Sequence, residues 1–196
     1  MSLPSERERG LLDEIAHELR EAFDERGHRV GVALDADPAF GSGHSRSALR
    51  RDLAKDVIAN AANRLGLHCR PVGGGGLELV GEHHRYRLRR ALRDASEALV
   101  VEVSSESSLG AEEEPGLFPA EHWVFAWIYD VNDLIAEVVI AKILGIEPGS
   151  PGRLCLGSVV ALGVSGPLSG GFMPTDEGLD FGDEEDMGGS ADGIGS

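Results

Sequence analysis

Two carboxylates beside a proline are the first residues whose type and spacing suggest chemistry. Asp35 and Asp37 stand on either side of Ala36, directly before Pro38. Magnesium prefers carboxylate oxygens, and a bound magnesium ion bridges phosphate groups and stabilises the charge that develops during phosphoryl transfer. Short carboxylates in an Asp-x-Asp-Pro turn also accept hydrogen bonds from their own backbone. The pair is therefore a candidate metal site, with a structural turn as the alternative.

A glycine- and serine-rich segment supplies a candidate anion site. Residues 39–45, Ala-Phe-Gly-Ser-Gly-His-Ser, precede a predicted helix, and free backbone N–H groups at a helix N-terminus bind phosphate. Its candidate ligands are Ser42 and Arg46, assisted by Arg50 or Arg51. The four glycines 73–76 have no predicted helix after them, so a flexible hairpin is the favoured interpretation there.

One run of arginines stands out in an acidic chain. Its members are Arg85, Arg87, Arg89, Arg90 and Arg93, and two histidines precede it. Arginine donors match phosphate oxygens, and the ring of Tyr86 can stack on a nucleobase, so a nucleotide-phosphate or nucleic-acid contact is one interpretation. The alternative is a solvated helix face whose arginines pair with nearby carboxylates.

Several classes of site find no support in the sequence. His44 and His122 have no nucleophile arranged with them and no Gly-x-Ser-x-Gly segment is present, which argues against a hydrolase. Cys69 and Cys155 match no zinc or redox spacing, so we expect two reduced thiols and a cytoplasmic protein. The first ten residues mix acidic and basic side chains, and no secretory signal is expected.

The apolar pattern predicts an alternation of helices and strands. Helices are predicted over 5–26, 45–65, 84–98 and 121–144, and strands over 29–34, 67–72, 77–80, 99–103 and 154–162. The segment 84–98 is ambiguous, because Tyr86 and Leu88 alternate as in a strand, whereas Leu88 and Leu92 fit a helix face; the helix is favoured. This order defines an α/β domain in which helices pack on a single sheet.

The hairpin between the second and third predicted strands distinguishes this order from a simple doubly wound fold. After the N-terminal helix, the order β-α-β-β-α-β-α-β over residues 29–162 resembles the palm of nucleotidyl cyclases and GGDEF diguanylate cyclases. In that family an Asp at the end of the first strand holds magnesium, so the resemblance implies Mg²⁺ at Asp35 and Asp37. The family also places an acid on the hairpin. Gly75 and Gly76 stand there instead, which implies degenerate catalysis.

The predicted helix 121–144 is the most apolar segment and is rich in aromatic residues. Trp123 and Trp127 alternate there with Phe125 and Tyr129. Core packing is the favoured interpretation of these rings, and an interface with a second copy or another protein is the alternative for the two tryptophans. Charged residues within the segment argue against a membrane span.

Charge and composition restrict the classes of function. The 196 residues include 34 acidic and 18 basic side chains, a net charge of −16, and eight of the carboxylates lie in residues 171–196. Such a field repels phosphate from most directions, so neither nucleic acid nor an anionic membrane is expected as the main partner. Residues 1–165 are predicted to form one domain with its N-terminal helix over 5–26, and residues 166–196 a disordered, acidic, glycine-rich tail.

These observations predict a nucleotide- or phosphate-binding module with a regulatory or interaction role, non-catalytic or catalytically degenerate. Two alternatives stay open: an active magnesium-dependent nucleotidyl cyclase or other phosphoryl-transfer enzyme, and a structural module that binds protein through residues 121–144. Magnesium is the candidate cofactor. A protein partner or a second copy of the chain is expected, and a nucleotide is the candidate ligand.

Overall fold

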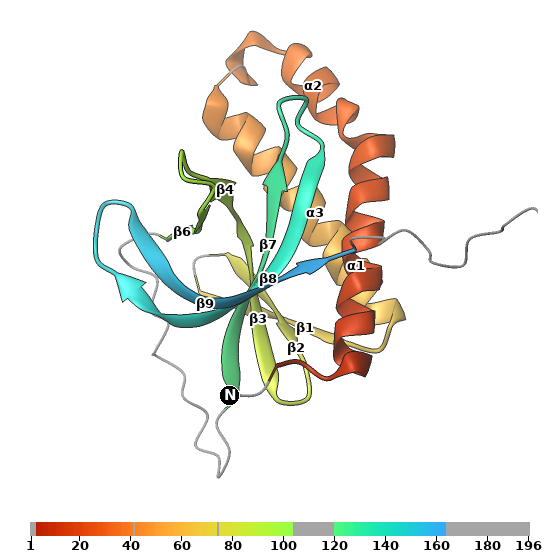
Figure 1. Ribbon diagram of the computed structural model, residues 1–196. Helices are drawn as coiled ribbons and strands as arrows, with labels where there is room; N and C mark the ends of the chain where they lie inside the picture. The colour runs from red at the N-terminus through yellow and green to blue at the C-terminus, as the bar shows by residue number, and fades with distance from the viewer. Residues whose placement is uncertain (1–2, 41, 74, 104–119, 164–196) are drawn as a thin grey trace, which may run out of the picture. The chain divides into compact units, whose positions relative to one another are not determined.

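The computed structural model describes residues 3–40, 42–73, 75–103 and 120–163 (Figure 1). This part of the chain is a mixed α/β structure in which three α-helices come first and a large curled sheet follows. The predicted tail, residues 166–196, lies outside the described residues, so the predicted division into a domain and a disordered tail stays a prediction.

The predicted N-terminal helix is confirmed as α1, which spans Glu6–Arg26. Ser5 caps it by accepting a hydrogen bond from the Glu8 backbone N–H at 3.2 Å. Its buried apolar side chains recur every three or four residues and include Leu12, Ile15 and Leu19. The second predicted helix is confirmed as α3, Gly43–Arg64, which begins after the capping residue Ser42.

The strand predicted over 29–34 is wrong, because these residues form helix α2, His28–Asp35. Val30 and Leu34 are buried, whereas Val32 between them is 66 % exposed. Burial at every fourth residue is the period of a helix, and a short apolar run does not by itself distinguish a helix from a strand. A short 3₁₀ helix, η1 (Pro38–Phe40), connects α2 to α3.

The main sheet has seven strands in the order β1-β2-β3-β7-β8-β9-β6. Their bounds are β1 His68–Val72, β2 Gly76–Val80, β3 His84–Arg90, β6 Glu102–Val103, β7 Glu121–Tyr129, β8 Ile135–Glu147 and β9 Gly152–Leu162. Strand β3 pairs in parallel with β7, and the other neighbours are antiparallel. Two short strands, β4 (Leu92–Arg93) and β5 (Leu99–Val100), pair separately. The predicted hairpin is confirmed by β1 and β2.

The helix predicted over 84–98 is wrong, and the alternating pattern within it was the correct signal. His84, Tyr86 and Leu88 are buried in β3, while the arginines between them are partly exposed. Side chains of a strand point alternately to opposite faces of the sheet, which produces this period of two. The strand predicted over 99–103 is confirmed in two pieces, β5 and β6.

The helix predicted over 121–144 is also wrong. Its residues form β7 and most of β8, joined by a turn in which the Asp130 carboxylate accepts hydrogen bonds from the backbone of Asn132 and Leu134 at 2.8 and 2.9 Å. Residues 123–128 of β7 are buried on both faces of the sheet. A strand buried on both faces is continuously apolar and loses the alternation that identifies a strand.

Both faces of the sheet are covered. Helices α1 and α3 pack on one face, where the core includes Phe125, Tyr86 and both tryptophans. Trp123 and Trp127 are each 1 % exposed, so the structure places these rings in the core, and neither side chain is accessible to a partner. A second core, on the opposite face, includes Val101, Val124 and Leu154. In Figure 1 the β8–β9 hairpin curls across this side of the sheet.

The order of the elements differs from the predicted alternation. Among the described residues all the helices precede all the strands, whereas the palm-like order requires helices between strands. The difference follows from the three misassigned segments, since each converts a helix to a strand or the reverse.

Candidate functional site: a cationic pocket

A cavity of about 320 Å³ lies where five parts of the structure meet. They are the N-terminal half of α3, the glycine turn between β1 and β2, the ends of β3 and β7, and Val103 of β6. Because β3 and β7 run in parallel, their carboxyl ends meet at the same edge of the sheet and bring Arg90 close to Tyr129. The topology therefore assembles the cavity from segments far apart in the sequence.

The lining of this cavity is positively charged. Among the described residues it includes six cationic side chains and no carboxylate, although the chain has almost twice as many acidic as basic residues. The six are Arg46, Arg50, Arg51, Lys55, Arg89 and Arg90. We call this cavity the cationic pocket.

Helix α3 supplies four of the six cations. Arg46 and Arg50, and likewise Arg51 and Lys55, are four residues apart and so project from the same side of the helix. The Lys55 ammonium donates a hydrogen bond to the Gly75 carbonyl and ties the helix to the glycine turn. Gly75 has φ of +67°, a left-handed conformation that glycine adopts without steric cost.

Burial and mutual repulsion act on two of these cations. Burial lowers the pKa of the Lys55 ammonium, and the charges of Arg51 and Arg89 lower it further, against the opposing effect of Asp52. Burial also lowers the pKa of the Arg89 guanidinium, followed by the charge of Arg87. Within the described part of the chain, neither Lys55 nor Arg89 forms an ion pair with a carboxylate. An anion in the pocket would relieve this repulsion.

The other side of the pocket is built around Tyr129. The guanidinium carbons of Arg50 and Arg90 lie 5.7 and 5.8 Å from the centre of its ring, which is cation–π distance. The Trp127 indole N–H donates a hydrogen bond to the Tyr129 hydroxyl at 3.0 Å and fixes the ring. Burial raises the pKa of the Tyr129 hydroxyl, so the ring stays neutral beside the two cations.

The structure brings together five of the arginines predicted for phosphate binding. Arg46, Arg89 and Arg90 line the cationic pocket, and so do Arg50 and Arg51, which were predicted to assist. Ser42 does not line it; its hydroxyl accepts the Ser45 backbone N–H at 3.2 Å as the cap of α3.

Two further predicted residues, Arg85 and Arg87, lie outside the pocket. Arg85 donates to the Gly81 carbonyl at 3.1 Å, and Arg87 Nε lies 3.7 Å from Glu78 Oε1. Glu78 is fully buried and also accepts a 2.7 Å hydrogen bond from Arg70. These arginines have carboxylate or backbone partners within the sheet.

The candidate metal residues occupy an exposed turn away from the pocket lining. Asp35 is the last residue of α2, and an Asp37 carboxylate oxygen accepts the Ala39 backbone N–H at 2.8 Å. Such a bond between a carboxylate and its own backbone is what the structural-turn interpretation of Asp35 and Asp37 expects. No group of three or more His, Cys, Asp or Glu side chains suited to a metal ion occurs among the described residues. Magnesium binding at Asp35 and Asp37 stays a prediction.

The sequence did not single out Lys55, Tyr129 or the glycine turn as parts of this site. Lys55 follows Arg51 by one helical turn, which was a visible signal for a cationic face on α3. Tyr129 and the turn carried no such signal, because their contribution depends on which strands end at this edge of the sheet.

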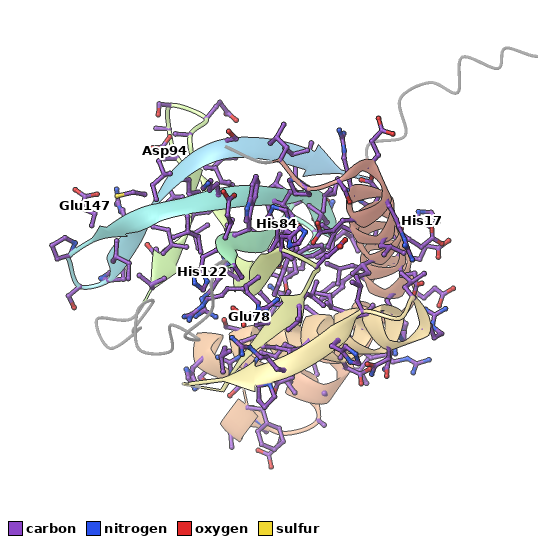
Figure 2. The ribbon with its side chains drawn as sticks, turned by 90° about the horizontal axis from the view of Figure 1, so that it is seen from below. His17, Glu78, His84, Asp94, His122 and Glu147 are labelled. Atoms are coloured by element: carbon purple, nitrogen blue, oxygen red, sulfur yellow. The ribbon has the colours of Figure 1, made fainter. Side chains whose placement is uncertain are left out.

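A second polar group is buried between α1 and the sheet. His84 Nδ1 lies 2.9 Å from a carboxylate oxygen of Glu8, and both side chains are less than a tenth exposed. The Glu8 charge also raises the pKa of the Tyr86 hydroxyl, in addition to the larger effect of burial. Figure 2 shows His84 in the interior and His17 on the outer side of α1. This group joins α1 to β3 and has no part in the cationic pocket.

No family model, curated protein or solved structure matches this chain. No helix among the described residues has the length and apolar character to cross a bilayer. The functional argument therefore rests on the chemistry of the cationic pocket.

Proposed function

We propose that this protein binds a small phosphate-bearing ligand in the cationic pocket and acts as a binding or regulatory module. The observation that carries the proposal is the pocket lining, in which the described residues supply six cations and no carboxylate in a protein of net charge −16. Keeping like charges together opposes folding, and a doubly charged phosphate group offsets that repulsion. Planar guanidinium groups also match the spacing of phosphate oxygens.

The size and walls of the pocket favour a small ligand over a macromolecule. Its volume of about 320 Å³ is at the lower end of the roughly 300–1,000 Å³ found for small-molecule sites. Tyr129 provides aromatic surface beside the cations, so nucleotides belong to the class of ligands that we propose.

Binding is favoured over phosphoryl transfer by the residues that line the pocket. Magnesium-assisted transfer uses carboxylate oxygens to hold the ion beside the phosphate. The described lining has none, and Asp35 and Asp37 are not part of it. An active cyclase is therefore an outcome that the ligand screen below has to test, by assaying turnover of ATP and GTP.

The first test is ligand binding by the full-length chain. Melting curves and titration calorimetry with orthophosphate, pyrophosphate, ADP and GTP would be compared for the natural chain and for Arg89→Gln and Lys55→Gln. We expect at least one of these ligands to raise the melting temperature, and each substitution to weaken its binding by about tenfold or more. A hydrogen bond to a charged group contributes roughly 1.5–3 kcal/mol, and about 1.4 kcal/mol is a factor of ten.

The matched control is Arg153→Gln, which removes the same charge from an exposed position on β9 outside the pocket. It should leave binding unchanged. Absence of binding by all four ligands, or an equal loss in the control, would refute the proposal. Arg89→Gln should not lower the melting temperature of the unliganded chain, because it removes a repelling charge.

A further inference from the structure

The six cations of the pocket form two groups. Arg51, Lys55 and Arg89 lie beside the glycine turn, and we call them the hairpin cations. Arg46, Arg50 and Arg90 lie on the side of Tyr129, and we call them the tyrosine cations. The two groups differ in what neutralises them.

Two of the three tyrosine cations already form ion pairs with a carboxylate of the chain itself. An Asp133 carboxylate oxygen forms an ion pair with Arg50, and the same oxygen lies 3.5 Å from Arg46 Nη1. Asp133 does not line the cavity, but its carboxylate binds two of the side chains that do. It therefore occupies donors that a ligand in the pocket would use.

The position of Asp133 is set by the turn between β7 and β8. Its backbone has φ of +68°, in the left-handed region, and its N–H donates to the Asp130 carbonyl at 3.2 Å. The Asp130 carboxylate holds the same turn through the backbone of Asn132 and Leu134. The turn thus presents the carboxylate at a fixed place beside Arg46 and Arg50.

The hairpin cations have much weaker compensation. Among the described residues, an Asp52 carboxylate oxygen lies 3.7 Å from Arg51 Nε, and both side chains are more than half exposed. An exposed pair of this kind is screened by water and contributes little. Lys55 and Arg89 are half-buried and form no ion pair within the described residues. An anion can therefore bind Lys55 and Arg89 without displacing a carboxylate of the described residues.

We infer that the ligand carries two neighbouring anionic groups, as a diphosphate does, and that one of them competes with Asp133 for Arg46 and Arg50. The inference rests on the proposed function. One phosphate binds the hairpin cations, and the second replaces a singly charged carboxylate that is 41 % exposed. A phosphate group with its greater charge and three acceptor oxygens is the stronger partner for two arginines. The Asp133 carboxylate is part of the chain and competes with the second phosphate for Arg46 and Arg50. It therefore lowers the affinity of the pocket for that phosphate.

The test compares two inorganic probes that differ in the number of phosphate groups. Titration calorimetry of the full-length chain would use pyrophosphate and orthophosphate with Asp133→Asn. Asparagine tolerates the left-handed conformation and keeps the shape of the side chain. Pyrophosphate affinity should rise by roughly fivefold or more, a typical size for coupling between two binding events. Orthophosphate affinity should change by less than about twofold, because a single phosphate binds the hairpin cations, with which Asp133 does not compete.

Two further variants separate local competition from a general charge effect. Asp24→Asn removes the same charge from an exposed position on α1 that does not line the pocket, and it should leave both affinities unchanged. Arg50→Gln should reduce pyrophosphate affinity to near that of orthophosphate, because the second phosphate loses its main partner. Asp133→Gly, which also tolerates the positive φ, should reproduce the effect of Asp133→Asn.

The outcomes distinguish this inference from the proposed function. If the natural chain and Asp133→Asn bind neither probe, the proposed function itself fails. If both bind orthophosphate, but pyrophosphate binds no more tightly and is unaffected by Asp133→Asn, the inference of two anionic groups is overturned while phosphate binding stands. If Asp133→Asn raised the affinities for orthophosphate and pyrophosphate equally, and Asp24→Asn raised them by the same factor, the cause would be a general charge effect. This result would also overturn the inference.

Discussion

Lys55 is the cation in the pocket whose charge responds to pH within an accessible range. Burial, followed by repulsion from Arg51 and Arg89, lowers the pKa of its ammonium from the ordinary value of 10.5. A bound phosphate favours the charged ammonium and therefore raises this pKa again. Binding and protonation of Lys55 are thus coupled.

We expect ADP affinity to fall as the pH rises through the lowered pKa of Lys55 in the free chain. Below this pKa the ammonium is charged and the affinity is complete; above it, binding must first restore the proton. Titration calorimetry at pH values from about 7 to 10 measures the effect, since the terminal phosphate of ADP loses its last proton near pH 6, below this window.

Lys55→Arg is the matched variant for the pH experiment. Arginine stays charged throughout this range, so the affinity of the variant should decline less with pH. The same decline in both proteins would show that Lys55 is not the titrating group.

At the scale of the element, strand β7 connects the core to the pocket. Its residues Trp123 and Phe125 are fully buried under the helices, and its end at Tyr129 forms one side of the cationic pocket. The strand lies next to β3 and β8, so its position is fixed from both sides. We therefore expect a substitution within the buried part of β7 to lower the stability of the core more than it lowers ligand affinity.

Trp123→Ala should destabilise the protein by about 3–5 kcal/mol, the usual cost of truncating a large buried aromatic side chain. Urea unfolding followed by circular dichroism measures this, and Trp123→Phe should lose less because much of the volume remains. Val131→Ala, at a 97 % exposed position in the turn after β7, is the control and should stay within about 0.5 kcal/mol of the natural chain. A changed oligomeric mass for Trp123→Ala with unchanged stability would favour the interface alternative instead.

The accuracy of the sequence-based assignments also differs between elements. Helices α1 and α3 were predictable because apolar residues recur along one face of each. The hairpin of β1 and β2 was predictable from its glycines. The types of α2 and β7 were not predictable, because a short apolar run such as α2 fits a helix or a strand, and β7 is buried on both faces and lacks the alternation that identifies a strand.

The candidate site was predictable only in its chemistry. The arginine run and the start of α3 both indicated anion binding, and five of the arginines named for it meet in the pocket: Arg46, Arg50, Arg51, Arg89 and Arg90. Which arginines of β3 meet there depends on the pairing of β3 with β7, because Arg89 and Arg90 stand at the carboxyl end of β3, whereas Arg85 and Arg87 lie further back along the strand. The pairing of strands cannot be obtained from local periodicity.

At the scale of the whole molecule, the net charge of −16 opposes the compact state. We expect the melting temperature to rise as sodium chloride increases from about 0.02 to 0.5 M, because salt shortens the distance over which the carboxylates repel one another, to about 10 Å at 0.1 M. Scanning calorimetry of the unliganded chain measures this.

Chloride is the suitable anion for this experiment, because sulfate resembles phosphate and is expected to bind the pocket. Potassium fluoride provides a second salt of similar ionic strength. A melting temperature that falls with both salts would indicate that attractive ion pairs, rather than repulsion, dominate the electrostatic contribution to stability.

The parallel pairing of β3 with β7 has a consequence for how the protein folds. Parallel neighbours cannot be joined by a tight turn, so the chain has to close a long loop before these strands meet. The hairpins β1–β2 and β8–β9 can form from local contacts, whereas the pocket needs α3, the glycine turn, β3 and β7 together. Ligand binding competence is therefore acquired at the end of folding. A phosphate ligand would act on the lifetime of the native state, by slowing its unfolding, and not on the rate at which the chain first collapses.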